Sequence, residues 1–162
     1  MENTNDFQKW VLTEEDFETL SWHDSRIHAI AFGPEKSEIV FDIDYIFEWI
    51  HPTQGQLNFS FRVAPATLVF ENVYAVEFDL DLDCGDGGLE IDSIRRELEG
   101  APRNAKYIGK DKEWLWTIEC QQGDIKFRAA GFQMYARARP QIVQTQNVMR
   151  KVSFERGEVP AI

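Results

Sequence analysis

The chain is poor in cysteine, which limits its redox and metal chemistry. Its 162 residues include only Cys84 and Cys120. Two thiols are too few for a disulfide framework or a structural zinc site. Cys120 falls in phase with the apolar residues of its segment and should be buried, whereas Cys84 lies beside glycines and should be more exposed. No basic group adjoins Cys84 to lower its pKa, so we expect neither thiol to be catalytic.

Long apolar runs are also missing. No stretch approaches the roughly 18 residues that a membrane-spanning helix needs. The N-terminal sequence MENTNDFQKW lacks the basic-then-apolar order of a signal peptide. We therefore expect a cytoplasmic protein with no membrane partner. Because 43% of the residues are hydrophobic, including 12 Phe and 5 Trp, we expect a single domain over residues 1–162 with a substantial core.

Basic side chains are scarce in the first part of the chain. Residues 1–100 carry 22 acidic and 6 basic side chains, a net charge of −16, whereas residues 101–162 carry 6 acidic and 11 basic ones, a net charge of +5. Phosphate contacts need clustered lysine and arginine, so the overall charge of −11 makes nucleic acid an improbable partner. It favours a basic protein partner, or simply solubility.

The apolar pattern has a period of two along most of the chain. In residues 38–50, for example, every odd position from Ile39 to Trp49 is apolar. Such alternation predicts strands with one buried face. Turn residues between 26–32 and 38–50, and between 113–120 and 125–139, predict two hairpins. The predicted strands cover 26–32, 38–50, 57–63, 68–73, 74–83, 113–120, 125–139 and 141–148.

Helical signals are few. Thr13, followed by three acidic residues, resembles a capped helix start and predicts a short helix over about residues 14–21. Pro65 should end or bend its strand. Residues 93–100 are typical of either a helical turn or an irregular loop. The sequence thus predicts a mainly β protein of about eight or nine strands, arranged as a two-layer antiparallel sandwich or a partly open barrel, with one short N-terminal helix.

The stretch 79-DLDLDCGDGGLEID-92 places acids at the spacing of a calcium-binding EF-hand loop. That loop needs glycine at its sixth position, where Cys84 stands, and it joins two helices rather than following a strand. A strand, a turn and a second strand therefore explain the stretch better. A looser cation site from Asp83, Asp86 and Glu90 is the alternative, and we expect no metal.

The acids of this strand need counter-charges. Lys126, Arg128, Arg137 and Arg139 alternate on later strands, and we expect some of them to lie beside the acidic strand face. The same segment, 135-YARAR-139, also supports a second interpretation. Tyr135, Arg137 and Arg139 could contact phosphate or RNA.

The densest group of chemically useful residues is 22-WHDSRIH-28. Its candidate binding residues are Trp22, His23, Asp24, Arg26 and His28. Histidine and aspartate together suit acid–base catalysis or ligand binding. In a regular strand, however, His28 shares a face with the apolar Ile30 and Phe32, and His23 lies on the opposite face. A structural role at a helix–strand junction is therefore the competing interpretation.

No nucleophile elbow, phosphate-binding loop or zinc-spaced set of Cys and His occurs in the sequence. We therefore assign no catalytic residue and no cofactor. The segment from Trp22 to Arg26, followed by an alternating hairpin, resembles small β-rich bacterial families, some of them grouped with immunity proteins of polymorphic toxin systems. This resemblance implies a bacterial cytosolic protein that binds a protein partner.

Three functional hypotheses follow. The first is a non-enzymatic acidic binding protein, which would present a surface patch of Trp or Tyr with carboxylates. The second is a metal-dependent or acid–base enzyme built on the 22–28 segment. The third is RNA binding through the YARAR face. Exposed edges of a β protein also favour self-association, so we expect either a monomer or a homodimer.

Overall fold

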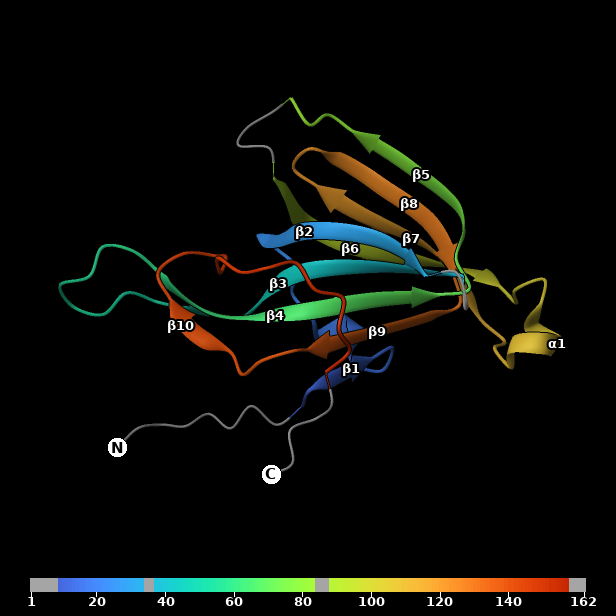
Figure 1. The fold of residues 1–162 in the computed structure, drawn as a ribbon, viewed down its shortest axis with the longest axis horizontal. Coiled ribbons are helices and arrows are strands. Elements are labelled where there is room, and N and C mark those ends of the chain that lie inside the picture. Colours follow the sequence, from blue (N-terminus) through green and yellow to red (C-terminus); the bar gives the residue numbers. More distant parts are fainter. Residues whose placement is uncertain (1–8, 34–36, 84–87, 158–162) are drawn as a thin grey trace.

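Ten antiparallel strands make up more than half of the residues that the structure describes. The computed structural model describes residues 9–33, 37–83 and 88–157. The strands are β1 (Val11–Thr13), β2 (Ser25–Gly33), β3 (Glu38–Ile50), β4 (Ser60–Glu71), β5 (Tyr74–Leu80), β6 (Leu89–Gly100), β7 (Glu113–Cys120), β8 (Gly123–Ala129), β9 (Gly131–Ala136) and β10 (Gln141–Val143). They form one sheet in the order β1-β9-β4-β3-β2-β6-β7-β8-β5, with β10 paired to β4 (Figure 1). The prediction of a mainly β fold is confirmed, and the sheet is not closed into a barrel.

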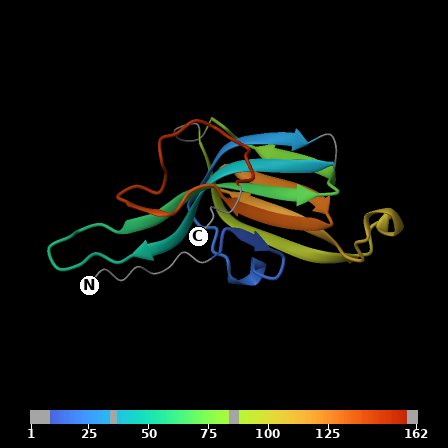
Figure 2. The same cartoon turned by 60° about the horizontal axis from the view of Figure 1, so that its bottom comes forward.

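The sheet curls so that its two halves face each other across one core (Figures 1 and 2). Aromatic rings join the halves. The ring centroids of Phe41 on β3 and Phe127 on β8 lie 6.4 Å apart, and those of Phe70 on β4 and Trp116 on β7 lie 4.8 Å apart. All four side chains are fully buried. The alternation read from the sequence therefore places the large apolar residues correctly on the inner face.

Helical structure is shorter than predicted. In place of a helix over residues 14–21, the structure has a single 3-10 turn, η1 (Phe17–Thr19), and the backbone is extended again at Leu20. The carboxylate of Asp16 accepts the Thr13 N–H at 2.8 Å, so the capping contact closes a turn directly after β1. A second short helix, α1 (Ala105–Ile108), lies between β6 and β7. No helix among the described residues is long and apolar enough to cross a bilayer.

Both predicted hairpins are present, as β2–β3 and β7–β8. Several strand assignments need correction. Residues 57–63 and 68–73 belong to the single strand β4, residues 125–139 are divided between β8 and β9, and the strand predicted over 74–83 ends at Leu80. Residues 93–100, read as a helical turn or a loop, belong to β6, and residues 57–59 precede β4 rather than forming part of it. The last predicted strand, 141–148, is limited to β10.

Pro65 neither ends nor bends β4 out of the sheet. Its carbonyl accepts the Arg137 N–H at 2.8 Å, just beyond the end of β9. Because the N–H and C=O of a strand residue point to the same side, the missing donor of Pro65 faces the place where β4 changes neighbour from β9 to β10. The donor that proline lacks falls between the two ladders, and β4 therefore runs through the proline.

Candidate functional site

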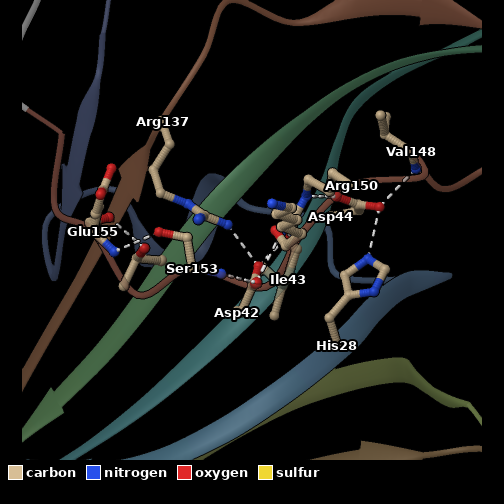
Figure 3. A network of polar contacts seen from close by, with 11 residues as sticks. His28, Asp42, Ile43, Asp44, Arg137, Val148, Arg150, Ser153 and Glu155 are labelled. Atoms are coloured by element: carbon tan, nitrogen blue, oxygen red, sulfur yellow. Dashed lines mark hydrogen bonds and ion pairs between the residues drawn. The ribbon is translucent and has the colours of Figure 1, made fainter.

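Two aspartates on β3 lie on the face of the sheet opposite the core, yet both are fully buried. Asp42 accepts hydrogen bonds from Arg137 at 2.6 Å, from Nη1 of Arg150 at 2.8 Å and from the backbone N–H of Ser153 at 2.8 Å (Figure 3). Neither arginine is more than 14% exposed. The alternation of residues 38–50 predicts that Asp42 is exposed to solvent, and this prediction is wrong.

Asp44 is held in the same way. It accepts hydrogen bonds from Arg150 Nε at 2.9 Å and from the Val148 N–H at 2.7 Å, and its Oδ2 lies 2.8 Å from Nε2 of His28 (Figure 3). Burial alone would raise the pKa of Asp44, but the hydrogen bonds from His28 and Val148 and the charge of Arg150 outweigh it and lower this pKa. Asp44 is therefore held in its charged form.

These contacts attach residues 144–157, here called the C-terminal strap, to the outer face of the sheet. The strap also has an apolar part, because Val148 packs with Val143 against the buried Ile46 and Val63. Farther along, the Thr67 hydroxyl donates to the Glu155 carbonyl at 2.6 Å, and Arg156 forms an ion pair with Glu38. Two carboxylates facing two guanidinium groups leave little uncompensated charge, which is the condition under which a buried ionic network is tolerated.

The network unites residues from two separate sequence hypotheses. Asp24 also joins the strap, since its carboxylate accepts a hydrogen bond from Gln146 at 3.0 Å. Asp24, His28 and Arg137 thus all contribute to holding one segment. The sequence signal for this was the basic excess after residue 100, which was expected to supply partners for the acidic strand. Arg137 lies beside Asp42 and not beside the acidic strand.

The acidic strand β5 lies beside two basic residues of β8, as predicted. Lys126 on β8 is directly opposite Glu77 on β5. Arg128 on β8 is opposite Tyr74 and pairs instead with Glu99 at 2.5 Å.

The position of His28 was predicted incorrectly. In the register of β2 with β3, Ile27 is opposite Ile43 and Ala29 is opposite Asp42, so His28 is the extra residue of a β-bulge. The bulge reverses the phase of the strand. His28 therefore shares the outer face with Asp44 rather than the apolar face with Ile30.

Trp22 has a structural role. It is 5% exposed, and its ring packs edge-on to Tyr45 and to Phe132 in the main core. Arg26 is half-buried on β2, where its guanidinium lies so close to Gly88 that a Cβ there would stand 2.2 Å from it. Trp22 is therefore part of the core, whereas Arg26 is only half-buried.

His23, by contrast, lies in an exposed aromatic and acidic patch. Its ring stacks on Trp49 at 6.0 Å with an interplanar angle of 16°, and its Nδ1 lies 3.0 Å from the carboxylate of Asp92. Phe59 lies 5.8 Å from Trp49 and 4.9 Å from His51, ring to ring. We call these five residues the Trp49 patch. Of these five residues, only His23 is among the binding residues predicted from the sequence.

The patch surrounds the root of the loop between β3 and β4. Residues 51–59 are all exposed, and the loop projects beyond the rest of the sheet (Figures 1 and 2). Leu57 in this loop is 95% exposed. The Asp92 carboxylate is 60% exposed, and the Asp24 carboxylate lies 3.6 Å from the other ring nitrogen of His23. Aromatic surface and carboxylates are therefore contiguous here.

The acid–base hypothesis finds no common centre. His23 and His28 contact different carboxylates, Asp92 and Asp44. Within residues 9–33, 37–83 and 88–157, no group of three His, Cys, Asp or Glu side chains is placed to hold a metal ion. Of the looser cation site considered as an alternative, Asp86 lies outside the described residues, as does Cys84.

The YARAR segment is not a free basic surface. Tyr135 donates its hydroxyl hydrogen to Gln133, and Arg137 is committed to Asp42. Only Arg139 of this group is exposed.

The thiol of Cys120 is buried as predicted, and burial raises its pKa to about 12. It is not a nucleophile at neutral pH.

Comparison with known proteins adds no name to this site. No protein family, no curated protein and no solved structure matches the chain.

Proposed function

We propose that this protein is a non-enzymatic cytoplasmic binding protein that recognises a basic protein partner through the Trp49 patch. The supporting observation is the contiguous surface of Trp49, Phe59 and His23 with the carboxylate of Asp92. Tryptophan is enriched among the residues that dominate binding energy at protein interfaces. A lysine or arginine of the partner can lie over an aromatic ring while a neighbouring carboxylate balances its charge.

The whole chain supports the same choice of partner. Its net charge of −11 attracts a basic surface at long range and increases the association rate. An immunity-like role, as implied by the sequence resemblance, is one form of this function, with a basic toxin as the partner. The YARAR alternative is less favoured because Arg137 is 9% exposed and already paired.

The test uses a displayed library of random peptides selected against the folded protein. We expect the enriched peptides to be rich in lysine and arginine, and their binding to weaken as salt is added, because exposed charges are screened. Binding should fall about tenfold or more in Trp49→Ala and in Phe59→Ala, since removing a central aromatic residue costs on the order of 2 kcal/mol at such sites.

The matched control is Tyr107→Ala. Tyr107 is an aromatic residue of α1 that is 87% exposed and lies outside the patch, so its removal should leave peptide binding unchanged. Trp49→Ala could weaken binding by disturbing the fold, because Trp49 packs partly against Phe61. Phe59 is exposed, so a loss of binding in Phe59→Ala reports the loss of a surface contact. Neutral or acidic peptides, or basic peptides that bind all three variants equally, would refute the proposal.

A further inference from the structure

The curled sheet leaves an open seam between β2 and β5. Among the described strands, β5 is the last of the sheet and pairs only with β8. On the other side of the seam, β2 pairs with β6 only through Ser25–Ile27, although it continues beside β3 as far as Gly33. The ring centroids of Phe32 on β2 and Phe78 on β5 lie 6.5 Å apart across this seam.

The exposure of these two phenylalanines indicates a missing neighbour. Phe32 is opposite Ile39 on β3, and Phe78 is opposite Ile125 on β8. Both isoleucines are fully buried in the main core, so both phenylalanines belong to the inner face. Phe32 is nevertheless 62% exposed and Phe78 is 45% exposed. A strand lying in the seam would cover both.

The backbone of β5 presents hydrogen-bonding groups to the seam. The Asp81 N–H donates to Gln122 at 2.8 Å, so the odd-numbered residues at this end of β5 direct their backbone groups toward β8. Successive residues of an antiparallel strand direct these groups to opposite sides. The N–H and C=O of Phe78 and Leu80 therefore point away from β8, into the seam.

The charge on β5 defines which strand fits. Glu77 and Asp79 are exposed on the outer face of the sheet, and Asp79 is opposite another acid, Asp124. In an added strand, the residues opposite Glu77 and Asp79 share this outer face, and those opposite Phe78 and Leu80 point inward. Cross-strand pairs of opposite charge stabilise such an arrangement. Basic and apolar residues would therefore alternate along the added strand.

We infer that β5 binds an extended segment of a basic partner protein, in which basic residues alternate with apolar ones, as an added strand. A second copy of this chain does not suit the seam, because pairing β5 with β5 brings Glu77 and Asp79 against like charges. Residues 1–8 and 158–162 carry acids and no lysine or arginine, so the ends of this chain do not suit it either. Strand addition at an open sheet edge is an established mode of peptide recognition. The inference does not depend on the Trp49 patch.

The experiment follows the amide hydrogen exchange of the intact protein with a short synthetic peptide that alternates lysine and valine. We expect the amides of Phe78 and Leu80 to exchange rapidly in the protein alone and to become protected when the peptide is added. The control peptide has the same composition with its lysines and valines in two blocks, and it should protect neither amide. A peptide N-methylated on the alternate residues that face β5 should also fail, because it lacks the donors.

The variant that tests the charge is Asp79→Lys. The substitution removes the repulsion between Asp79 and Asp124, so we expect the fold to be retained. It should lower the affinity of β5 for the alternating peptide at least about fivefold, because the added lysine faces the lysines of the peptide. Glu97→Lys, at an exposed acid on β6, is the matched control and should leave the protection of Phe78 and Leu80 by the alternating peptide unchanged.

Four results would overturn the inference. The first two are equal protection of Phe78 and Leu80 by both peptides, and protection that survives Asp79→Lys. The third is protection of these amides in the dilute protein alone, which would mean that an end of the chain occupies the edge. The fourth is protection that appears only as the protein is concentrated, which would mean that a second copy occupies it.

Discussion

Asp42 is the residue whose removal should affect stability most directly. It is fully buried and accepts hydrogen bonds from two arginines and from the Ser153 N–H. Replacing it with alanine leaves two nearly buried guanidinium groups without a carboxylate, so Asp42→Ala should lower the free energy of unfolding by about 3–5 kcal/mol. Urea denaturation followed by tryptophan fluorescence measures this loss.

The control for this prediction lies on the same strand. Glu48 pairs with Arg62 at 3.0 Å, but the Glu48 side chain is 47% exposed and that of Arg62 is 27% exposed. Exposed pairs contribute little, so Glu48→Ala should change the free energy of unfolding by less than about 1 kcal/mol. Equal losses in Asp42→Ala and Glu48→Ala would show that the strap is not held by buried charge.

Asp44 makes the stability of the protein depend on pH. Its pKa in the folded protein lies below the ordinary value of 3.8. The unfolded chain therefore takes up a proton first as the pH falls, and the stabilisation from Asp44 is complete above about pH 4 and lost as the pH falls through its folded-state pKa. We expect the free energy of unfolding to fall less steeply in Asp44→Asn than in the natural sequence between about pH 5 and about pH 2.

An exposed acid provides the comparison. Asp79→Asn should keep the steep acid dependence, because it leaves Asp44 and its partners in place. If Asp44→Asn and the natural sequence lose stability in parallel, the carboxylate of Asp44 does not anchor the strap. Denaturant titrations across the acid range decide between these outcomes.

At these two residues, sequence analysis identified the correct face but not what covers it. Asp42 and Asp44 alternate with core residues, as in a strand with one exposed face. Their arginine partners lie 95 to 108 residues farther along the chain. A period of two reports only which side of the sheet a side chain occupies. The arrival of a distant segment on that side leaves no local signal.

Bulges explain the errors at the scale of strands. In β6 the register shifts between Ile91 and Ser93, and as a result Ile91 and Ile94 both face the core although they are three residues apart. In β2 the bulge at His28 likewise places Ile27 and Ile30, three residues apart, on the core face. Apolar residues three apart are the usual sign of a helix. Residues 93–100 resemble a helical turn closed by Gly100, yet they form part of β6.

The turn between β7 and β8 depends on Gly123. Its φ is +129°, and a Cβ at this position would stand 2.0 Å from the carbonyl oxygen of Asp79 on β5. Gly123→Ala should therefore strain the hairpin and displace β5, and lower the free energy of unfolding by at least about 2 kcal/mol. Gly55 also has a positive φ but has no atom within 4 Å of such a Cβ. Gly55→Ala should cost only about 1 kcal/mol.

Hydrogen exchange separates the two effects of Gly123→Ala. Faster exchange at the Asp81 amide, which donates to Gln122, would report the loosening of β5 from β8. A loss of stability in Gly55→Ala equal to that in Gly123→Ala would mean that the strained backbone alone, and not the approach of β5, requires glycine.

For the whole molecule, the sequence predicts the chemistry of the surfaces better than their arrangement. Alternation is enough to predict a mainly β protein with a large aromatic core. The order of the strands depends on long-range pairing, such as β1 with β9 and β2 with β6, and no local pattern encodes it. The two surfaces proposed for binding, the Trp49 patch and the seam at β5, both arise from this order, because each brings together residues from separate strands or loops.

The shared core predicts that the molecule unfolds as one unit. Phe70 on β4 contacts Trp116 and Phe127 from the other half of the sheet, at ring distances of 4.8 Å and 4.7 Å. In denaturant, tryptophan fluorescence and far-ultraviolet circular dichroism should therefore report one coincident transition. Phe70→Ala should lower both midpoints together, with a loss of about 3–5 kcal/mol. Leu98→Ala, at a side chain 57% exposed, should leave them nearly unchanged. Separate midpoints for the two probes would mean that the two halves of the sheet fold independently.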